Sequence, residues 1–95
     1  MCHIAPSKGK FPLGQIVATP NALNAIPPDE IQGALDRHSH GEWGTLDQED
    51  WNANEQALVL GGRLFSAYQS AQKVKFWIIT EHDRSVTTVL LPEDY

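Results

Sequence analysis

The last third of the chain alternates apolar and polar positions with a period of two, which is typical of β-strands. Three such runs are rich in aromatic and β-branched residues, and polar linkers separate them: Arg63–Gln69, Val74–Glu81 and Val86–Leu91. The linkers have about four residues each, and linkers of this length favour hairpins. The pattern therefore predicts a three-stranded antiparallel meander. The middle run is apolar on both faces, with Phe76 and Trp77 pointing to opposite sides, and it is expected to be the central strand.

Helix signals come earlier in the chain. Thr19 before Pro20 predicts a short, capped helix that runs to about Ile26. A second helix is expected to begin at Pro28, where two carboxylates follow. Its apolar residues recur every three or four positions, and this pattern predicts that the helix ends near Gly41.

The clearest helix start lies at Asp47. With Asp47 as N-cap, Leu46 and Trp51 take the N′ and N4 positions of a hydrophobic staple. This predicts a helix of about 13 residues that ends before Gly61, which accepts a positive φ. Asn54 lies on the apolar face of this helix, so we expect its amide to hydrogen-bond a neighbouring backbone, such as the turn after Gly61.

These elements together predict the fold class. A short strand is expected at Gln15–Thr19, and residues 1–13, with two prolines and a glycine, are expected to be a flexible lead-in. Residues 14–95 then form a single α+β domain of two layers: a short N-terminal strand, two to three helices and a three-stranded antiparallel meander. The N-terminal strand is expected to join an edge of the sheet.

Charge narrows the classes of partner. The chain has 95 residues and a formal net charge of −5. The imbalance is local, because residues 29–55 hold eight acidic residues and one basic residue. Nucleic-acid affinity depends largely on Lys and Arg, and the seven basic residues form no stripe in the sequence. We therefore expect no direct binding to nucleic acid.

The apolar runs and the cysteine content indicate a compartment. No apolar run approaches the roughly 20 residues that a membrane-spanning helix needs, so no membrane association is expected. Cys2 is the only cysteine and can form no internal disulfide, which fits a reducing environment. The first eleven residues lack the apolar stretch of a secretory signal. The sequence therefore predicts a cytoplasmic protein.

The densest set of chemically capable side chains lies in the linker between the last two predicted strands: Glu81, His82, Asp83 and Arg84. Such a set offers proton transfer or phosphate binding. A solvated turn explains it better, with Asp83 supplying turn chemistry and Glu81 pairing with Arg84 across the base. We keep these four residues as candidate binding residues and assign no catalytic residue.

Two further features could carry chemistry. His38 and His40 stand near a carboxylate, but no second Cys or His cluster completes a metal site, so no metal or cofactor is expected. His38 is instead expected to cover the last helical turn, where its protonated form would favour the dipole. Trp43, flanked by two glycines, is either a lid over the core or a contact residue for a partner.

Several stretches resemble a known group of proteins. The motif Gly-Gly-Arg-Leu-x-Ser-Ala-Tyr stands at 61–68, and Leu-Leu-Pro-Glu-Asp-Tyr stands at 90–95. With the segment Phe11–Pro20, these stretches resemble small uncharacterised bacterial proteins borne on plasmids and genomic islands, and the likeness covers most of residues 11–95. The resemblance implies a mobile-element setting, and it carries over no activity or catalytic residue.

Three functions stay open at this point. The leading expectation is a non-enzymatic accessory protein that binds another protein, so enzyme activity is not expected. One alternative is an acidic inhibitor that mimics nucleic acid and blocks a host defence nuclease, which would show a continuous negative face. Another is a small enzyme of the ribonuclease-toxin type, which would hold Arg63, Lys75 and Arg84 on a basic sheet face.

Overall fold

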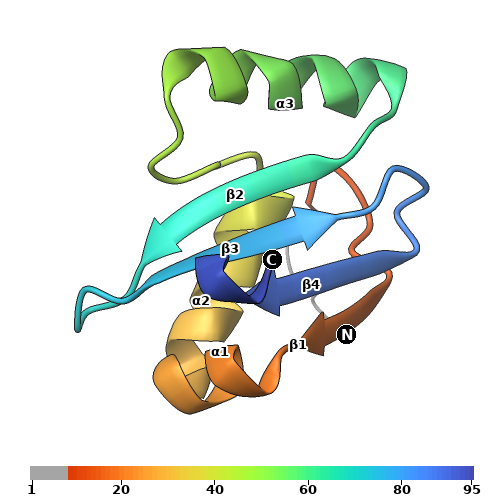
Figure 1. The fold of residues 1–95 in the computed structure, drawn as a ribbon. Coiled ribbons are helices and arrows are strands. Elements are labelled where there is room, and N and C mark those ends of the chain that lie inside the picture. The colour runs from red at the N-terminus through yellow and green to blue at the C-terminus, as the bar shows by residue number, and fades with distance from the viewer. Residues whose placement is uncertain (1–8) are drawn as a thin grey trace, which may run out of the picture.

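A four-stranded sheet forms the centre of the molecule, as the computed structural model of residues 9–95 shows (Figure 1). The strand order is β1-β4-β3-β2. The elements are, in chain order, β1 (Gln15–Ala18), α1 (Pro20–Ala25), α2 (Pro28–Ser39), α3 (Gln48–Leu60), β2 (Leu64–Gln69), β3 (Lys75–Thr80), β4 (Val86–Leu90) and the 3-10 helix η1 (Pro92–Asp94). The predicted α+β class with its N-terminal strand is confirmed.

The sheet is mixed rather than purely antiparallel. β2, β3 and β4 form the predicted meander, since β3 pairs antiparallel with both neighbours. β1 joins the β4 edge in parallel, with Gln15 opposite Val86 and Ala18 opposite Val89. The sequence leaves this choice open, because no short turn constrains two strands that lie so far apart along the chain.

One face of the sheet is covered by helix α2. Ala34 and Leu35 of this helix are buried in a cluster with Phe76, Ile78 and Val89 from the two central strands. Ala22 of helix α1 and Ile26, which directly follows that helix, belong to the same cluster. The main core of the molecule therefore lies between α2 and the side of the sheet that faces it.

The β2 edge is sealed by α3 and by the segment before it. Asn54 of α3 bonds both backbone groups of Phe65: its Nδ2 donates to the carbonyl at 2.6 Å, and its Oδ1 accepts from the N–H at 3.1 Å. Further along the edge, Ala67 N–H donates to Trp43 O, and Ala67 O accepts from Thr45 N–H. The expected tie through Asn54 is confirmed, but its partner is β2 and not the turn after the helix.

The predicted helix caps are present. Thr19 Oγ1 accepts from Ala22 N–H at the start of α1, and Asp47 Oδ1 accepts from Asp50 N–H at the start of α3. Helix α3 has the expected 13 residues and ends at Gly61, whose φ is 85°. Local chemistry therefore sets the limits of these two helices.

Order begins earlier than expected. Phe11 is buried in a second apolar cluster with Trp43 and Leu64, and Lys10 N–H donates to Ser39 O at 2.6 Å. Residues 9–13 therefore belong to the packed structure, because an aromatic side chain anchors them. The rest of the predicted lead-in, residues 1–8, lies outside the described residues.

Within residues 9–95, no α-helix covers the second face of the sheet, and only the short η1 lies on it. Figure 1 looks onto this face, with α2 behind the strands and α3 along the β2 edge. None of the helices in the described part of the chain is long and apolar enough to cross a membrane.

Candidate functional site

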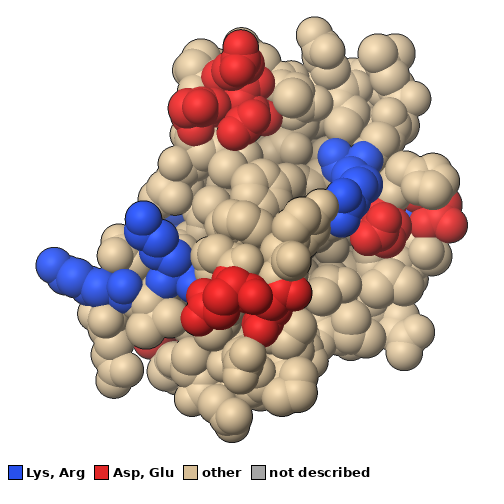
Figure 2. Space-filling view, in the orientation of Figure 1, with Lys and Arg blue, Asp and Glu red and all other residues tan. Residues whose placement is uncertain are grey.

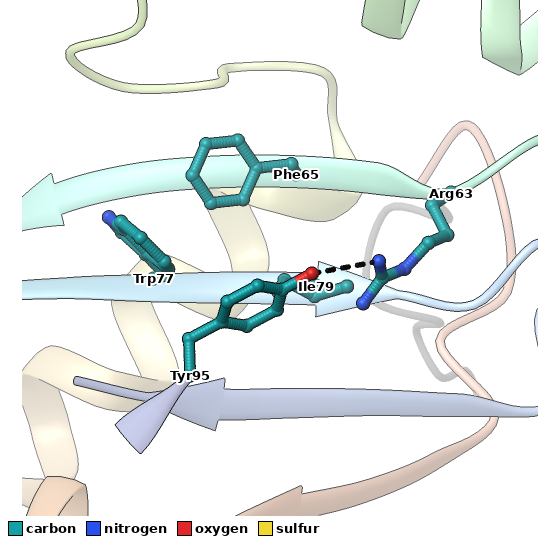
Figure 3. A pocket seen from close by; sticks show the side chains of 5 residues that line it. All are labelled: Arg63, Phe65, Trp77, Ile79 and Tyr95. Atoms are coloured by element: carbon teal, nitrogen blue, oxygen red, sulfur yellow. Dashed lines mark hydrogen bonds between the residues drawn. The ribbon is translucent and has the colours of Figure 1, made fainter. Parts of the chain in front are cut away.

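A hollow on the uncovered face of the sheet is built by alternate residues of β2 and β3. Phe65 stands opposite Ile79, and Trp77 stands opposite Ala67, so the side chains of Phe65, Ile79 and Trp77 project from one face. Tyr95, which follows η1, lies across these strands (Figure 3). We call the surface formed by Arg63, Phe65, Trp77, Ile79 and Tyr95 the aromatic hollow.

The aromatic rings of the hollow meet edge to face. The ring centres of Phe65 and Trp77 lie 5.0 Å apart at 82°, and those of Trp77 and Tyr95 lie 5.8 Å apart at 69°. This geometry is favourable for aromatic pairs. The hollow encloses about 250 Å³ and is partly open to solvent, so it is large enough for one bulky side chain of a ligand.

Arg63 forms the polar end of the hollow. Its Nη1 donates to the Tyr95 hydroxyl at 3.2 Å (Figure 3), and its Nε lies 3.6 Å from Glu81 Oε1. The hydrogen bond with Tyr95 raises the pKa of Arg63, and the group stays charged at any physiological pH. The Arg63 side chain is about half exposed, and a guanidinium carries five N–H donors, so Arg63 can also donate to a ligand at the rim.

Charged side chains surround the hollow in separate groups. Figure 2 shows acidic and basic groups around a central uncharged area, and neither sign forms a continuous surface on this face. Of the three basic residues considered for a ribonuclease, Arg63 and Lys75 belong to the hollow's side of the sheet. Arg84 does not, because its guanidinium donates to the carbonyls of Gly62 and Ala57.

The second polar cluster is closed to solvent. His38 is 0% exposed, and its ring nitrogens contact Ser66 Oγ at 2.5 Å and Thr80 Oγ1 at 2.9 Å. Thr80 Oγ1 in turn lies 2.8 Å from Thr87 Oγ1, which donates to Leu13 O. Every polar group of this network has a partner, so the network ties α2 to the covered face of the sheet.

The buried position of His38 corrects one expectation. Burial, with a smaller contribution from the charge of Arg84, lowers the pKa of His38 to about 4. The ring is therefore neutral at physiological pH and does not act as a protonated group at the end of the helix. Neither does it share a site with His40, whose Nδ1 lies 2.7 Å from the Asp36 carbonyl.

No match to this chain was found among protein-family models, curated proteins or solved structures. Across residues 9–95, no three His, Cys, Asp or Glu side chains come together as a metal site would require.

Trp43 is fully buried, which decides between its two predicted roles. Its ring stacks on Phe11 at 6.2 Å, and its Nε1 donates to Glu55 at 2.8 Å. The indole is a core residue and has no surface for a partner to contact in this structure. The flanking glycines are consistent with an exposed loop, but Gly44 has a different role. Its φ of 82° lets the chain pass against the backbone of Ala67, and this path places Trp43 in the core.

The four candidate residues of the β3–β4 linker form a turn. Asp83 Oδ1 accepts from both Ser85 N–H and Ser85 Oγ, and these bonds lower the pKa of Asp83. The expected ion pair of Glu81 with Arg84 is replaced, since the Glu81 carboxylate faces Arg63 and Arg84 donates to the Glu81 carbonyl. His82 is exposed, and a binding role for these residues stays a prediction.

The aromatic hollow was missed from the sequence. The sequence pattern predicts that Trp77 lies on a sheet face, but the β2–β3 register places Phe65 and Ile79 beside it, and the hairpin linker alone does not fix that register. Tyr95 directly follows Glu93 and Asp94, and no apolar pattern in the sequence links it to the strands. Phe65 and Trp77, two aromatic residues of one parity on neighbouring strands, would have been the available signal.

Proposed function

We propose that this chain is a non-enzymatic binding module that docks a partner protein on the uncovered face of its sheet. The observation that carries the proposal is the aromatic hollow, where Phe65, Trp77 and Tyr95 stand at the surface without a covering helix. Aromatic side chains with one apolar face and one polar tip are characteristic of the energetic centres of protein interfaces.

The chemistry of the hollow indicates what the partner presents. Its walls are aromatic and aliphatic, and the central area between the charged groups is uncharged (Figure 2). A segment that inserts one large apolar or aromatic side chain matches these walls, and Arg63 can donate to a carbonyl or carboxylate beside that side chain. In this proposal the partner is a protein with such an anchor.

The two alternatives find less support. The His38 and Ser66 pair has the side chains of an acid–base site, but α2 closes it off from any substrate. The acidic groups on the face in Figure 2 are separated from one another, whereas a nucleic-acid mimic would need a continuous array. From the aromatic hollow and the sequence resemblance together, we propose that the protein is a cytoplasmic accessory protein of a mobile element and acts by this binding.

Affinity capture from a nuclease-treated lysate of a bacterial host tests the proposal, with three forms of the chain as bait. The wild type and Val59→Ala, whose side chain is 82% exposed on α3, should capture the same protein. Tyr95→Ala should lose it, with the purified partner binding at least about tenfold more weakly. Equal capture by Tyr95→Ala would contradict the proposal, and so would a protein that is captured from an untreated lysate and not from the nuclease-treated one.

A further inference from the structure

The two edges of the sheet are unlike. The β2 edge is sealed by Asn54 and by the segment around Trp43. The β1 edge has no such cover, and nothing within residues 9–95 hydrogen-bonds its outward backbone groups. Natural sheets usually protect an edge with charges, prolines or a covering element, so an open edge calls for an explanation.

The register shows which groups of β1 point outward. Gln15 N–H donates to Ser85 O and Thr19 N–H donates to Val89 O, both at 2.9 Å, so odd-numbered residues bond β4. Because alternate residues of a strand bond opposite neighbours, the N–H and C=O groups of Ile16 and Ala18 point to the open edge. This edge therefore offers two donors and two acceptors.

Apolar side chains flank these groups. Ile16 is 48% exposed and Val17 is 38% exposed, and Leu23 of the following helix is also exposed. The strand Gln15–Ala18 contains no charged residue in a chain whose formal net charge is −5. The edge thus combines unpaired backbone groups with an apolar, uncharged surface.

We propose that a second copy of this chain pairs antiparallel along β1, about a twofold axis at Val17. In this register Ile16 stands opposite Ala18 of the other copy, and Ala18 stands opposite Ile16 of that copy. Each opposed pair exchanges two hydrogen bonds, so four bonds satisfy all the outward groups of both strands. Val17 meets Val17 of the other copy as a non-hydrogen-bonded pair, in which side chains lie close.

Self-complementarity is the reason for choosing a second copy as the occupant. A twofold interface uses the same patch on both chains, and here the outward groups are arranged symmetrically about one residue. Two chains of like net charge repel, but no charged side chain of either β1 meets its counterpart across this axis. Antiparallel pairing also closes the assembly at two copies, because residues 9–95 of each chain leave one edge of the sheet uncovered.

The pairing would join two four-stranded sheets into one continuous sheet. A twofold axis normal to the sheet keeps both uncovered faces on the same side, so the two aromatic hollows would face the same way. The inference does not depend on the proposed function, because β1 lies at the opposite edge of the sheet from β2.

Sedimentation equilibrium over a wide concentration series tests the pairing. The wild type should fit a reversible monomer–dimer equilibrium. Val17→Lys places two ammonium groups opposite one another and should weaken the dimer at least about tenfold. The matched control Val59→Lys, on the exposed face of α3, should dimerise like the wild type, which separates a local effect from a change in net charge.

Amide hydrogen exchange gives a second readout that keeps folding and pairing apart. In concentrated samples the amides of Ile16 and Ala18 should be protected, and dilution should remove this protection. The amides of Gln15 and Thr19 bond β4 within the chain and should stay protected at every concentration. A wild type that stays monomeric throughout the series, or a Val17→Lys chain that dimerises as the wild type does, would overturn the proposal.

Discussion

The two faces of the sheet differ in a way that reverses the usual expectation about polarity. The face under α2 buries polar side chains completely, among them His38, Ser66 and Thr80. The uncovered face leaves large aromatic side chains such as Trp77 and Tyr95 partly or largely in solvent. The same strands supply both faces, because successive residues of a strand point to opposite sides.

The difference shows that a face of the sheet can bury polar side chains when all of them are hydrogen-bonded. Polarity alone therefore does not tell which face is covered. Under α2, each buried polar group meets a partner within the chain, so that face needs nothing further. On the other face, apolar area stays in contact with water and gains from being covered. The covered face therefore carries stability, and the uncovered face is available for binding.

The largest expected effect is that of truncation under α2. Phe76 is 2% exposed, and Phe76→Ala should lower the free energy of unfolding by about 4 kcal/mol, because it leaves a cavity in the core. Phe65→Ala, on the uncovered face, should cost about half as much, since the Phe65 ring is only half-buried. Urea unfolding of both variants measures the difference. Equal losses would mean that the two faces do not differ in this way.

The second prediction concerns the pH dependence of the covered face. The pKa of His38 is about 4 in the folded chain and near 6.5 in the unfolded chain, so the unfolded state takes up the proton first. Stability from this group is complete above pH 6.5 and falls as the pH decreases toward 4, by about 3 kcal/mol in total. Below that, the loss from this group is complete.

The variant His38→Gln isolates this effect, since Gln does not titrate. The pH slope of its unfolding free energy between 6.5 and 4 should be shallower than that of the wild type. Asp83 and Asp94 have lowered pKa values, and their contribution is lost only at lower pH, as the pH falls through those values. Identical slopes for the two proteins in the window would show that His38 is not held neutral by the fold.

Much of the fold was predictable because its signals are local. The cap at Asp47 fixes the start of α3, and short linkers fix the meander, since each depends on neighbouring residues. The parallel pairing of β1 was not predictable, because it joins residues from opposite ends of the sequence. The same reason applies to Phe11, whose place in the core depends on partners around Trp43.

The candidate site was harder to predict than the fold. Aromatic residues on strands are equally consistent with a covered or an uncovered face, and only the position of the helices distinguishes the two. Helices α1, α2 and α3 lie between β1 and β2 along the chain, and no local sequence signal tells which side of the sheet they cover. Likewise, Trp43 stood out by its glycine neighbours, yet its partner Glu55 lies in α3.

The smallest expected effect on stability is that of Tyr95→Ala. This variant tests whether side chains on the uncovered face contribute little to stability. Tyr95 is 71% exposed, and its contacts are an exposed hydrogen bond with Arg63 and an edge contact with Trp77. A surface substitution of this kind should change the free energy of unfolding by no more than about 0.5 kcal/mol.

The same change should expose the Trp77 indole to water and shift its fluorescence emission to longer wavelength, whereas Trp43 is shielded in the core and should not respond. Val59→Ala is the control, since it truncates a side chain that is 82% exposed and should leave the emission unchanged. If Tyr95→Ala instead cost as much as Phe76→Ala, the uncovered face would be part of the core and would not be a surface held open for a partner.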